Sequence, residues 1–167
     1  MTIILITGGA RSGKSARAEA RARSFAGKPV YIATAEALDG EMRERIARHR
    51  ERRANEWIEH ETPIELVAAL AATDGGGARL VDCLTLWLSN LLHAGHDWEG
   101  ETARLTNTLA AQRSPVVLVT NEVGLGIVPD NALARQFRDA AGLMNQTIAG
   151  AADEVELVVA GLPMRVK

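Results

Sequence analysis

The stretch that decides the fold is residues 3–15, IILITGGARSGKS, in which an apolar run leads directly into a glycine-rich segment. Its second part fits the pattern G-x-x-x-x-G-K-S of a phosphate-binding loop. In such a loop backbone N–H groups point at the phosphates of a nucleoside triphosphate, the lysine reaches the β- and γ-phosphates, and the serine hydroxyl can hold Mg²⁺. The predicted loop consists of Gly8, Gly9, Ala10, Arg11, Ser12, Gly13, Lys14 and Ser15.

The residues that follow the loop support this interpretation. Residues 16–22, ARAEARA, are rich in strong helix formers. A helix that begins there would turn the positive end of its dipole toward bound phosphates. A tight glycine turn without a ligand is the alternative, and the apolar run and the helical sequence on either side make it the weaker one.

Size and composition indicate a soluble cytoplasmic protein. The 167 residues suit one domain, spanning 1–167. A net charge of −2, with 47% hydrophobic and 24% charged residues, gives no reason to expect nucleic acid or a membrane as partner, so we expect small-molecule substrates. The single cysteine, Cys83, lies in an apolar run, which predicts a core residue in a reducing compartment. The sequence has no recognisable signal segment and no apolar stretch of membrane-spanning length.

Short β-branched runs alternate with helical stretches along the chain. Strands are expected at 3–7, 30–34, 79–83, 116–120 and 155–160, and helices at 15–26, 39–54, 63–73, 84–93, 99–113 and 130–151. Two of the strands, at 116–119 and 155–159, are apolar almost throughout, which is typical of strands covered on both faces. The alternation predicts a doubly wound, mostly parallel α/β sheet flanked by helices.

In open α/β sheets, ligands bind outside the carboxyl ends of the strands. Asp82 ends the run Arg79-Leu80-Val81-Asp82 in the expected third strand, where a Walker-B carboxylate would help to organise Mg²⁺. The alternative is that Asp82 is the N-cap of a helix starting at Leu84. After the fourth strand, Thr120, Asn121 and Glu122 either sense the nucleotide or satisfy local backbone groups, and the sequence leaves both readings open.

A cationic stretch at 41–53, EMRERIARHRERR, is the second strong signal, with six arginines against three glutamates. Part of it can be a solvated face, because Glu41 with Arg45 and Glu44 with Arg48 form i,i+4 pairs. The end of the stretch keeps an excess of cationic donors, which suits phosphate oxygens.

His49 lies within this excess of positive charge. Its spacing from Met42 and Ile46 puts it on the apolar face of the expected helix, which by itself favours a core or interface histidine. Arginines on both sides, however, disfavour the imidazolium and keep the ring neutral and nucleophilic. A neutral imidazole beside bound phosphates could attack phosphorus.

Taken together, these segments resemble the bifunctional adenosylcobinamide kinase/adenosylcobinamide-phosphate guanylyltransferase family. The resemblance runs in order through nearly the whole chain. It rests on 8–15, 31–35, Arg45-Ile46 with His49 and Arg53, Trp57 with 61–63, 120–124, 126–129, Arg135, 137–139, Gly142, 145–146 and 152–155.

The resemblance implies a RecA-like P-loop NTPase domain that assembles as a homotrimer. It also implies two reactions: a nucleoside triphosphate, ATP or GTP, phosphorylates adenosylcobinamide, and GMP then passes from GTP to that phosphate through a GMP-histidine intermediate. Lys14 and His49 would be the catalytic residues, and Ser15 and Asp82 would hold Mg²⁺. Nucleotide contacts would come from the phosphate loop and from Thr34, Ala35, Glu36, Arg50, Glu51, Arg52, Arg53, Glu61 and Asp82.

Two other functions share part of this pattern. A plain P-loop small-molecule kinase has similar size, a phosphate loop and helical arginines, but leaves no covalent nucleotide on the protein. A nucleotide-dependent switch or motor subunit would have no small-molecule acceptor. The sequence lacks the Asn-Lys-x-Asp motif of conventional GTPase switches.

Overall fold

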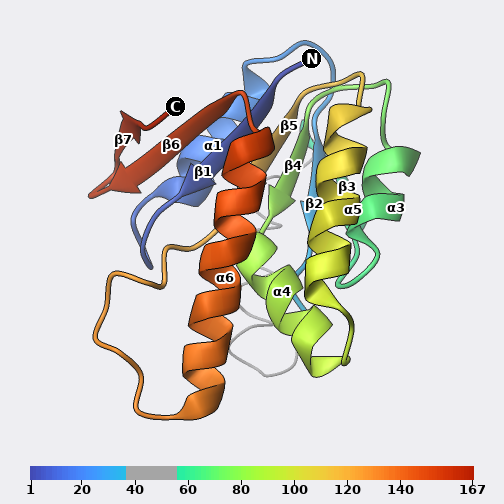
Figure 1. The fold of residues 1–167 in the computed structure, drawn as a ribbon. Coiled ribbons are helices and arrows are strands. Elements are labelled where there is room, and N and C mark those ends of the chain that lie inside the picture. Colours follow the sequence, from blue (N-terminus) through green and yellow to red (C-terminus); the bar gives the residue numbers. More distant parts are fainter. Residues whose placement is uncertain (37–55) are drawn as a thin grey trace.

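The structure is a computed structural model in which residues 1–36 and 56–167 are described (Figure 1). Its centre is a seven-stranded sheet with the order β3-β2-β4-β5-β1-β6-β7. Neighbouring strands are parallel except for β7, which runs antiparallel to β6. The strands are β1 (Ile3–Thr7), β2 (Val30–Ala33), β3 (Ile58–Glu61), β4 (Arg79–Asp82), β5 (Val116–Val119), β6 (Glu154–Val159) and β7 (Leu162–Arg165).

Helices cover both faces of the sheet. One face packs against α1 (Lys14–Arg23), and the other against α3 (Leu66–Ala72), α4 (Leu84–His93), α5 (Trp98–Ala110) and α6 (Ala132–Ala151), as Figure 1 shows. The segment between β5 and α6 extends away from this layered body (Figure 1). Among the described residues, no helix has the length and apolar character needed to cross a bilayer.

The strands supply two cores because successive side chains point to opposite faces. In β1, Ile3 and Leu5 join the cluster beneath α3–α6, whereas Ile4 and Ile6 join the cluster beneath α1. All four are at most 4% exposed. Each such burial contributes about 1.5–3 kcal/mol, which explains why the central strands are apolar on both sides.

Ion pairs anchor α1 to β6. The guanidinium of Arg17 donates from Nε and Nη2 to the two carboxylate oxygens of Glu156, at 2.7 and 2.8 Å. Arg21 donates to Glu156 at 2.9 Å and to Glu154 at 2.8 Å. The hydrogen bond from Arg17 holds the pKa of Glu156 below its usual value although burial opposes this. These contacts fix the helix that follows the glycine-rich loop.

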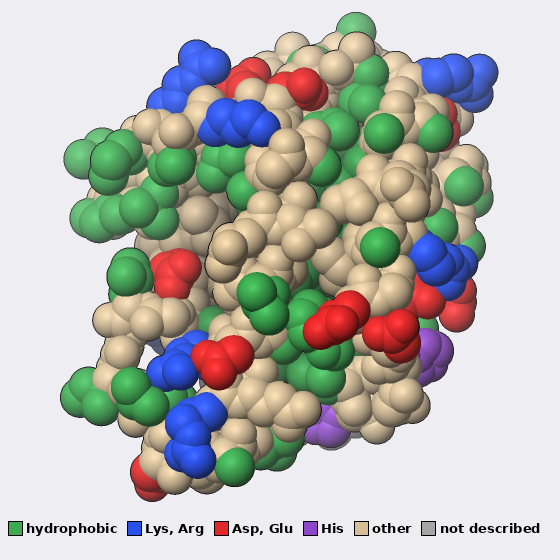
Figure 2. Space-filling model, in the orientation of Figure 1, with side chains coloured by type: hydrophobic (Ala, Val, Ile, Leu, Met, Phe, Trp, Pro, Cys, Tyr) green, Lys and Arg blue, Asp and Glu red, His purple; other side chains and the backbone are tan. Residues whose placement is uncertain are grey.

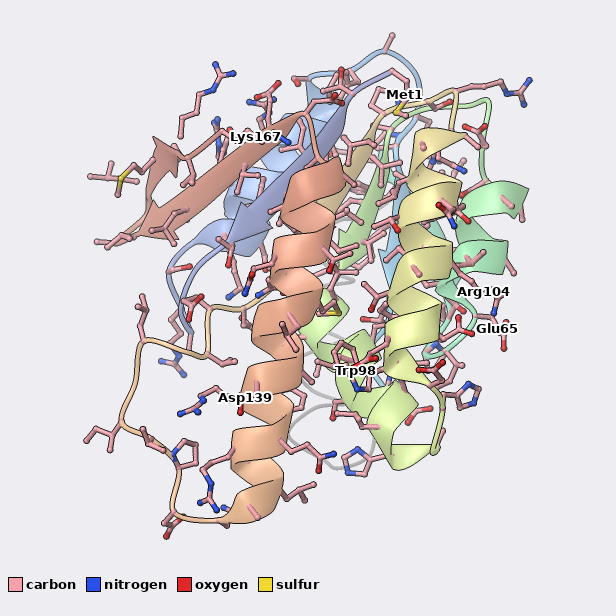
Figure 3. All side chains as sticks on the ribbon, in the orientation of Figure 1. Met1, Glu65, Trp98, Arg104, Asp139 and Lys167 are labelled. Atoms are coloured by element: carbon pink, nitrogen blue, oxygen red, sulfur yellow. The ribbon has the colours of Figure 1, made fainter. Side chains whose placement is uncertain are left out.

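Side chains cap both ends of α6. The Asn131 side chain accepts a hydrogen bond from the backbone N–H of Ala134 at 2.8 Å. At the other end, Lys167 Nζ donates to the carbonyls of Ala149, Gly150 and Ala152 at 3.2, 3.1 and 2.6 Å (Figure 3). A cation at a helix C-terminus also interacts favourably with the helix dipole.

The five strands expected from the sequence are confirmed to within a residue at each end, but β3 and β7 were missed. Strand β3, with the sequence IEHE, lacks the apolar character of a central strand because it lies at one edge of the sheet. Strand β7 lies at the other edge, is exposed throughout and contains Pro163, which edge strands tolerate. The helix expected at 39–54 lies outside the described residues.

Candidate active site

The carboxyl ends of the parallel strands bring the predicted site residues to one edge of the sheet. Ala33 at the end of β2 is in register with Glu61 of β3 and with Asp82 of β4. Asp82 is in turn in register with Val119 of β5, and Val119 with Ile6 of β1. The phosphate loop starts just beyond Ile6, so the loop, Asp82 and Glu61 share this edge, as expected for a ligand site in an open α/β sheet.

The phosphate loop holds its lysine against its own backbone. Lys14 is 9% exposed, and its Nζ donates to the carbonyl of Gly9 at 3.1 Å. The Ser12 hydroxyl is buried and has no hydrogen-bond partner in the described part of the chain. Ser15 lies in the first turn of α1, where the helix dipole favours an anion. A buried polar group without a partner is costly, and oxygens of a bound phosphate would satisfy it.

The turn between β6 and β7 supports the loop from the side. The N–H of Gly161 in this turn donates to the carbonyl of Ser12 at 2.8 Å. Gly13 has φ +95°, and a Cβ there would lie 3.1 Å from the Cα of Gly161. At Gly8 a Cβ would come within 2.5 Å of the carbonyl oxygen of Val158. The two glycines of the motif are therefore required by backbone conformation and close packing.

Tyr31 holds the Asp82 carboxylate. Its hydroxyl, on β2, donates to Asp82 Oδ2 at 2.7 Å, and Tyr31 is 5% exposed. The Tyr31 ring packs edge-on against Trp57, with centroids 5.7 Å apart. The N-cap of α4 is Cys83, not Asp82, so the N-cap alternative for Asp82 is wrong. Asp82 is instead an oriented carboxylate at the strand end.

Thr34 joins the ends of β2 and β4. Its hydroxyl donates to the carbonyl of Cys83 and accepts from the Cys83 N–H, both at 2.8 Å. Its backbone N–H also donates to the Asp82 carbonyl at 3.1 Å. The side chain of Thr34 is thus committed to the backbone, while Ala35 is half-buried and Glu36 is exposed beside it.

Cys83 is a core residue, as the sequence predicted, and is not a nucleophile. Burial raises the pKa of its thiol to about 11; the charge of Asp82 adds to this shift and that of Lys14 opposes it. The thiol therefore stays protonated near neutral pH.

The segment after β5 lies beside the phosphate loop. The Glu122 N–H donates to the carbonyl of Gly8 at 3.1 Å. The carboxylate of Glu122 accepts from the N–H groups of Gly124 and Leu125 at 2.5 and 3.1 Å, so it does satisfy local backbone groups.

Sequence reasoning did not single out Tyr31 as a partner of Asp82, and no local pattern marks that contact, because 51 residues separate the two.

The cationic stretch lies outside the described residues, and with it His49, Arg50, Glu51, Arg52 and Arg53. His60 lies in β3, and the ring of His93 is 2.7 Å from the carbonyl oxygen of Ser89. Across residues 1–36 and 56–167, no group of three or more His, Cys, Asp or Glu side chains could hold a metal ion.

Solved structures with this fold come from distant proteins. The flagellar accessory protein FlaH from Methanocaldococcus jannaschii is 12% identical with a TM-score of 0.56, covering 99% of this chain and 78% of FlaH. A KaiC-like protein from Pyrococcus horikoshii is 13% identical with a TM-score of 0.54, covering 93% of this chain and 70% of its own. At such identities the likeness concerns the fold alone, which is that of P-loop NTPases.

Closer relatives match over almost the full length. The bifunctional adenosylcobalamin biosynthesis protein CobP of Pseudomonas aeruginosa is 47% identical over 98% of this chain and 96% of its own. The bifunctional adenosylcobalamin biosynthesis protein CobU of Salmonella typhimurium is 45% identical over 99% of each chain. The family model described as cobinamide kinase / cobinamide phosphate guanyltransferase matches residues 4–166. The chain therefore belongs to the cobinamide kinase / cobinamide phosphate guanyltransferase family.

Proposed function

We propose that this chain, as one domain over residues 1–167, phosphorylates adenosylcobinamide with ATP or GTP and then transfers GMP from GTP to the product. The observation that carries this proposal is the edge where the phosphate loop, Lys14 and the oriented Asp82 come together. Its full-length similarity to bifunctional adenosylcobalamin biosynthesis proteins supports the choice of substrates.

In the transfer reaction, His49 is the nucleophile. Its neutral ring nitrogen attacks the α-phosphorus of GTP, a nitrogen–phosphorus bond forms, and the bond to pyrophosphate breaks. An oxygen of adenosylcobinamide phosphate then displaces GMP from the ring, which releases the histidine. Lys14 and the arginines at 50, 52 and 53 stabilise the negative charge on the phosphoryl oxygens and on pyrophosphate.

Mg²⁺ suits the oxygens available beside the loop. The hydroxyl of Ser15 and the carboxylate of Asp82 are hard oxygen donors of the kind that Mg²⁺ prefers. The ion would supply charge neutralisation between the phosphates. Thr34, Ala35, Glu36, Glu51 and Glu61 complete the proposed nucleotide contacts. The hydroxyl, the backbone N–H and the carbonyl of Thr34 are already bonded, so Thr34 would contact the nucleotide by packing against it.

We also propose that the protein works in the cytoplasm as a homotrimer. Exposed apolar side chains support self-association, since a monomer rarely leaves large apolar patches uncovered. They lie on β7 and on the segment between β5 and α6 (Figure 2), and include Leu162, Met164, Leu125, Ile127 and Val128.

Mass spectrometry after incubation with GTP and Mg²⁺ tests the covalent route. We expect a GMP-sized adduct on His49 that is absent in His49→Ala and retained in the matched control His96→Ala, which alters an exposed histidine.

Lys14→Ala should slow both reactions by about 10²–10³-fold, because a charged group that stabilises the transferring phosphoryl is lost. Cobinamide phosphorylation without an adduct would favour a plain kinase, and nucleotide turnover that cobinamide does not stimulate would favour a switch or motor subunit.

A further inference from the structure

A closed ring of hydrogen bonds joins the end of β5 to α4 and α6. The N–H of Asn121 donates to Thr85 Oγ1 at 2.7 Å, and Thr120 Oγ1 donates to Asn145 Oδ1 at 2.7 Å. The Asn145 amide donates to the carbonyl of Asn121 at 3.3 Å, and the hydroxyl oxygens of Thr85 and Thr120 are 3.2 Å apart. Since Thr120 gives its only hydroxyl proton to Asn145, Thr85 must donate to Thr120. The donor and the acceptor of every hydrogen bond in the ring are therefore determined.

The ring fixes the backbone of Asn121 and leaves its side chain available. Thr85 is 7% exposed and Thr120 is fully buried, so water does not compete freely for these bonds. The N–H and the carbonyl of Asn121 are both engaged in the ring. Its side-chain amide, by contrast, has no hydrogen bond to any of the described residues and is half-buried. A rigid backbone thus carries an uncommitted polar group.

The position of Asn121 is set by its neighbours on both sides. The N–H of Thr120 donates to the carbonyl of Ile6 at 3.0 Å, and the N–H of Glu122 donates to that of Gly8 at 3.1 Å. Asn121 therefore runs alongside the start of the phosphate loop. Strand β5 lies between β1, which leads into this loop, and β4, which ends at Asp82.

The alternation of side chains predicts that the Asn121 amide points to the face of the sheet that α1 covers. Val119 packs in the cluster beneath α1, whereas Thr120 turns to the opposite face, where it bonds Asn145 of α6. In an extended segment the next side chain returns to the first face. This is the face covered by α1, the helix that follows the phosphate loop.

We infer that the side-chain amide of Asn121 donates a hydrogen bond to the terminal phosphate of the bound triphosphate, with Thr85, Thr120 and Asn145 as positioning residues. The inference rests on the proposed function only in that a triphosphate occupies the loop. A hydrogen bond to a charged group favours the triphosphate over the diphosphate by about tenfold or more, because the diphosphate lacks the acceptor.

Equilibrium binding of GDP and of a non-hydrolysable GTP analogue, both with Mg²⁺, tests this contact. We expect Asn121→Ala to weaken binding of the analogue about tenfold and to change binding of GDP less than twofold. The matched control is Asn107→Ala, an exposed asparagine on α5, which should change neither. An unchanged analogue-to-GDP ratio in Asn121→Ala overturns the inference alone. Wild-type protein that binds neither nucleotide overturns the proposed function as well.

The positioning role has its own test. Thr85→Val removes the acceptor for the Asn121 N–H at similar volume, and Asn145→Asp keeps the acceptor for Thr120 but loses the donor to the Asn121 carbonyl. Both should lower the analogue-to-GDP ratio in the same direction as Asn121→Ala, and Thr85→Ser should restore it. If Thr85→Val lowers the melting temperature and weakens both nucleotides equally, the ring is merely structural and the positioning role fails.

Discussion

The amino and carboxyl ends of the parallel strands, here called the amino edge and the carboxyl edge of the sheet, differ in how they use polar groups. At the amino edge, the carboxylate of Asp74 accepts the backbone N–H groups of Arg113 and Ser114 at 3.0–3.1 Å. It also lies 3.1 Å from the guanidinium of Arg79, whose side chain is fully buried and also donates to Gln112. At the carboxyl edge, the buried hydroxyl of Ser12 and the half-buried side-chain amide of Asn121 have no hydrogen-bond partner among the described residues.

This contrast distinguishes charged groups that stabilise the fold from polar groups that are available to bind a ligand. The buried charge of Arg79 is tolerated because the protein supplies the counter-charge of Asp74 and a hydrogen bond to Gln112, although Nε and Nη1 of Arg79 make no hydrogen bond among the described residues. A polar group held rigidly beside a loop and left without a partner costs stability unless a ligand satisfies it. We therefore expect substitutions at the amino edge to change the free energy of unfolding, and those at the carboxyl edge to change nucleotide binding.

The largest effect should come from Asp74→Ala. Without this carboxylate the buried guanidinium of Arg79 loses its counter-charge, and breaking such a pair costs about 3–5 kcal/mol. Urea unfolding should show this loss, while the affinity for GTP of the protein that remains folded stays unchanged. The control is Asp139→Ala on α6 (Figure 3), whose side chain is 63% exposed and which should cost less than about 0.5 kcal/mol. Weakened GTP binding in Asp74→Ala would show that the two edges are coupled.

Acid should weaken the amino edge through the same carboxylate. Burial opposes ionisation of Asp74, but the hydrogen bonds from Ser114, Arg113 and Gly75 outweigh it and lower the pKa from 3.8 to about 2. A carboxyl group whose pKa is lower in the folded state stabilises the folded state at pH values above its pKa in the unfolded chain. This contribution, about 2 kcal/mol, is lost as the pH falls from about 4 through 2.

Unfolding measured across this pH range checks the effect. Asp74→Asn should flatten the acid dependence of the free energy of unfolding, leaving the part due to Glu156, whose pKa is also lowered. An acid dependence identical to that of the wild type would rule out Asp74 as its source.

Local patterns predicted the central fold and the phosphate loop because each is encoded within a few residues. The apolar runs at β1 and β5 mark buried strands, and the motif at Gly8–Ser15 marks the loop. Edge strands lack this signal, since β3 and β7 bury too few side chains to require an apolar run. Both strands were consequently missed.

The partners of the site residues could not be predicted in this way. Asp82 was found because it ends a strand, but its contact with Tyr31 spans 51 residues. The hydrogen bonds that link Thr120 with Thr85 and with Asn145 span 35 and 25 residues. Such contacts depend on strand order and helix placement, which the alternation of strands and helices does not specify.

The smallest expected effect is that of Tyr31→Phe, which tests whether the Tyr31–Asp82 bond belongs to the site. Phenylalanine keeps the edge-on contact with Trp57 and removes the hydroxyl that holds Asp82 Oδ2, so the loss of stability should be about 1.5 kcal/mol, the lower end for a hydrogen bond to a charged group. If Asp82 holds Mg²⁺, a less oriented carboxylate should raise the Mg²⁺ concentration needed for half-maximal GTP binding about tenfold.

A Mg²⁺ titration of GTP binding, with urea unfolding in parallel, measures both quantities for Tyr31→Phe. A change in the Mg²⁺ requirement with a loss of stability no larger than this would place the hydrogen bond with the ligand-directed groups of the carboxyl edge. An unchanged requirement with a large loss of stability would instead make Asp82 a structural carboxylate like Asp74. Asp82, which the sequence predicted as a Mg²⁺ ligand, would then contribute to stability and not to ligand binding, contrary to the difference expected between the two edges.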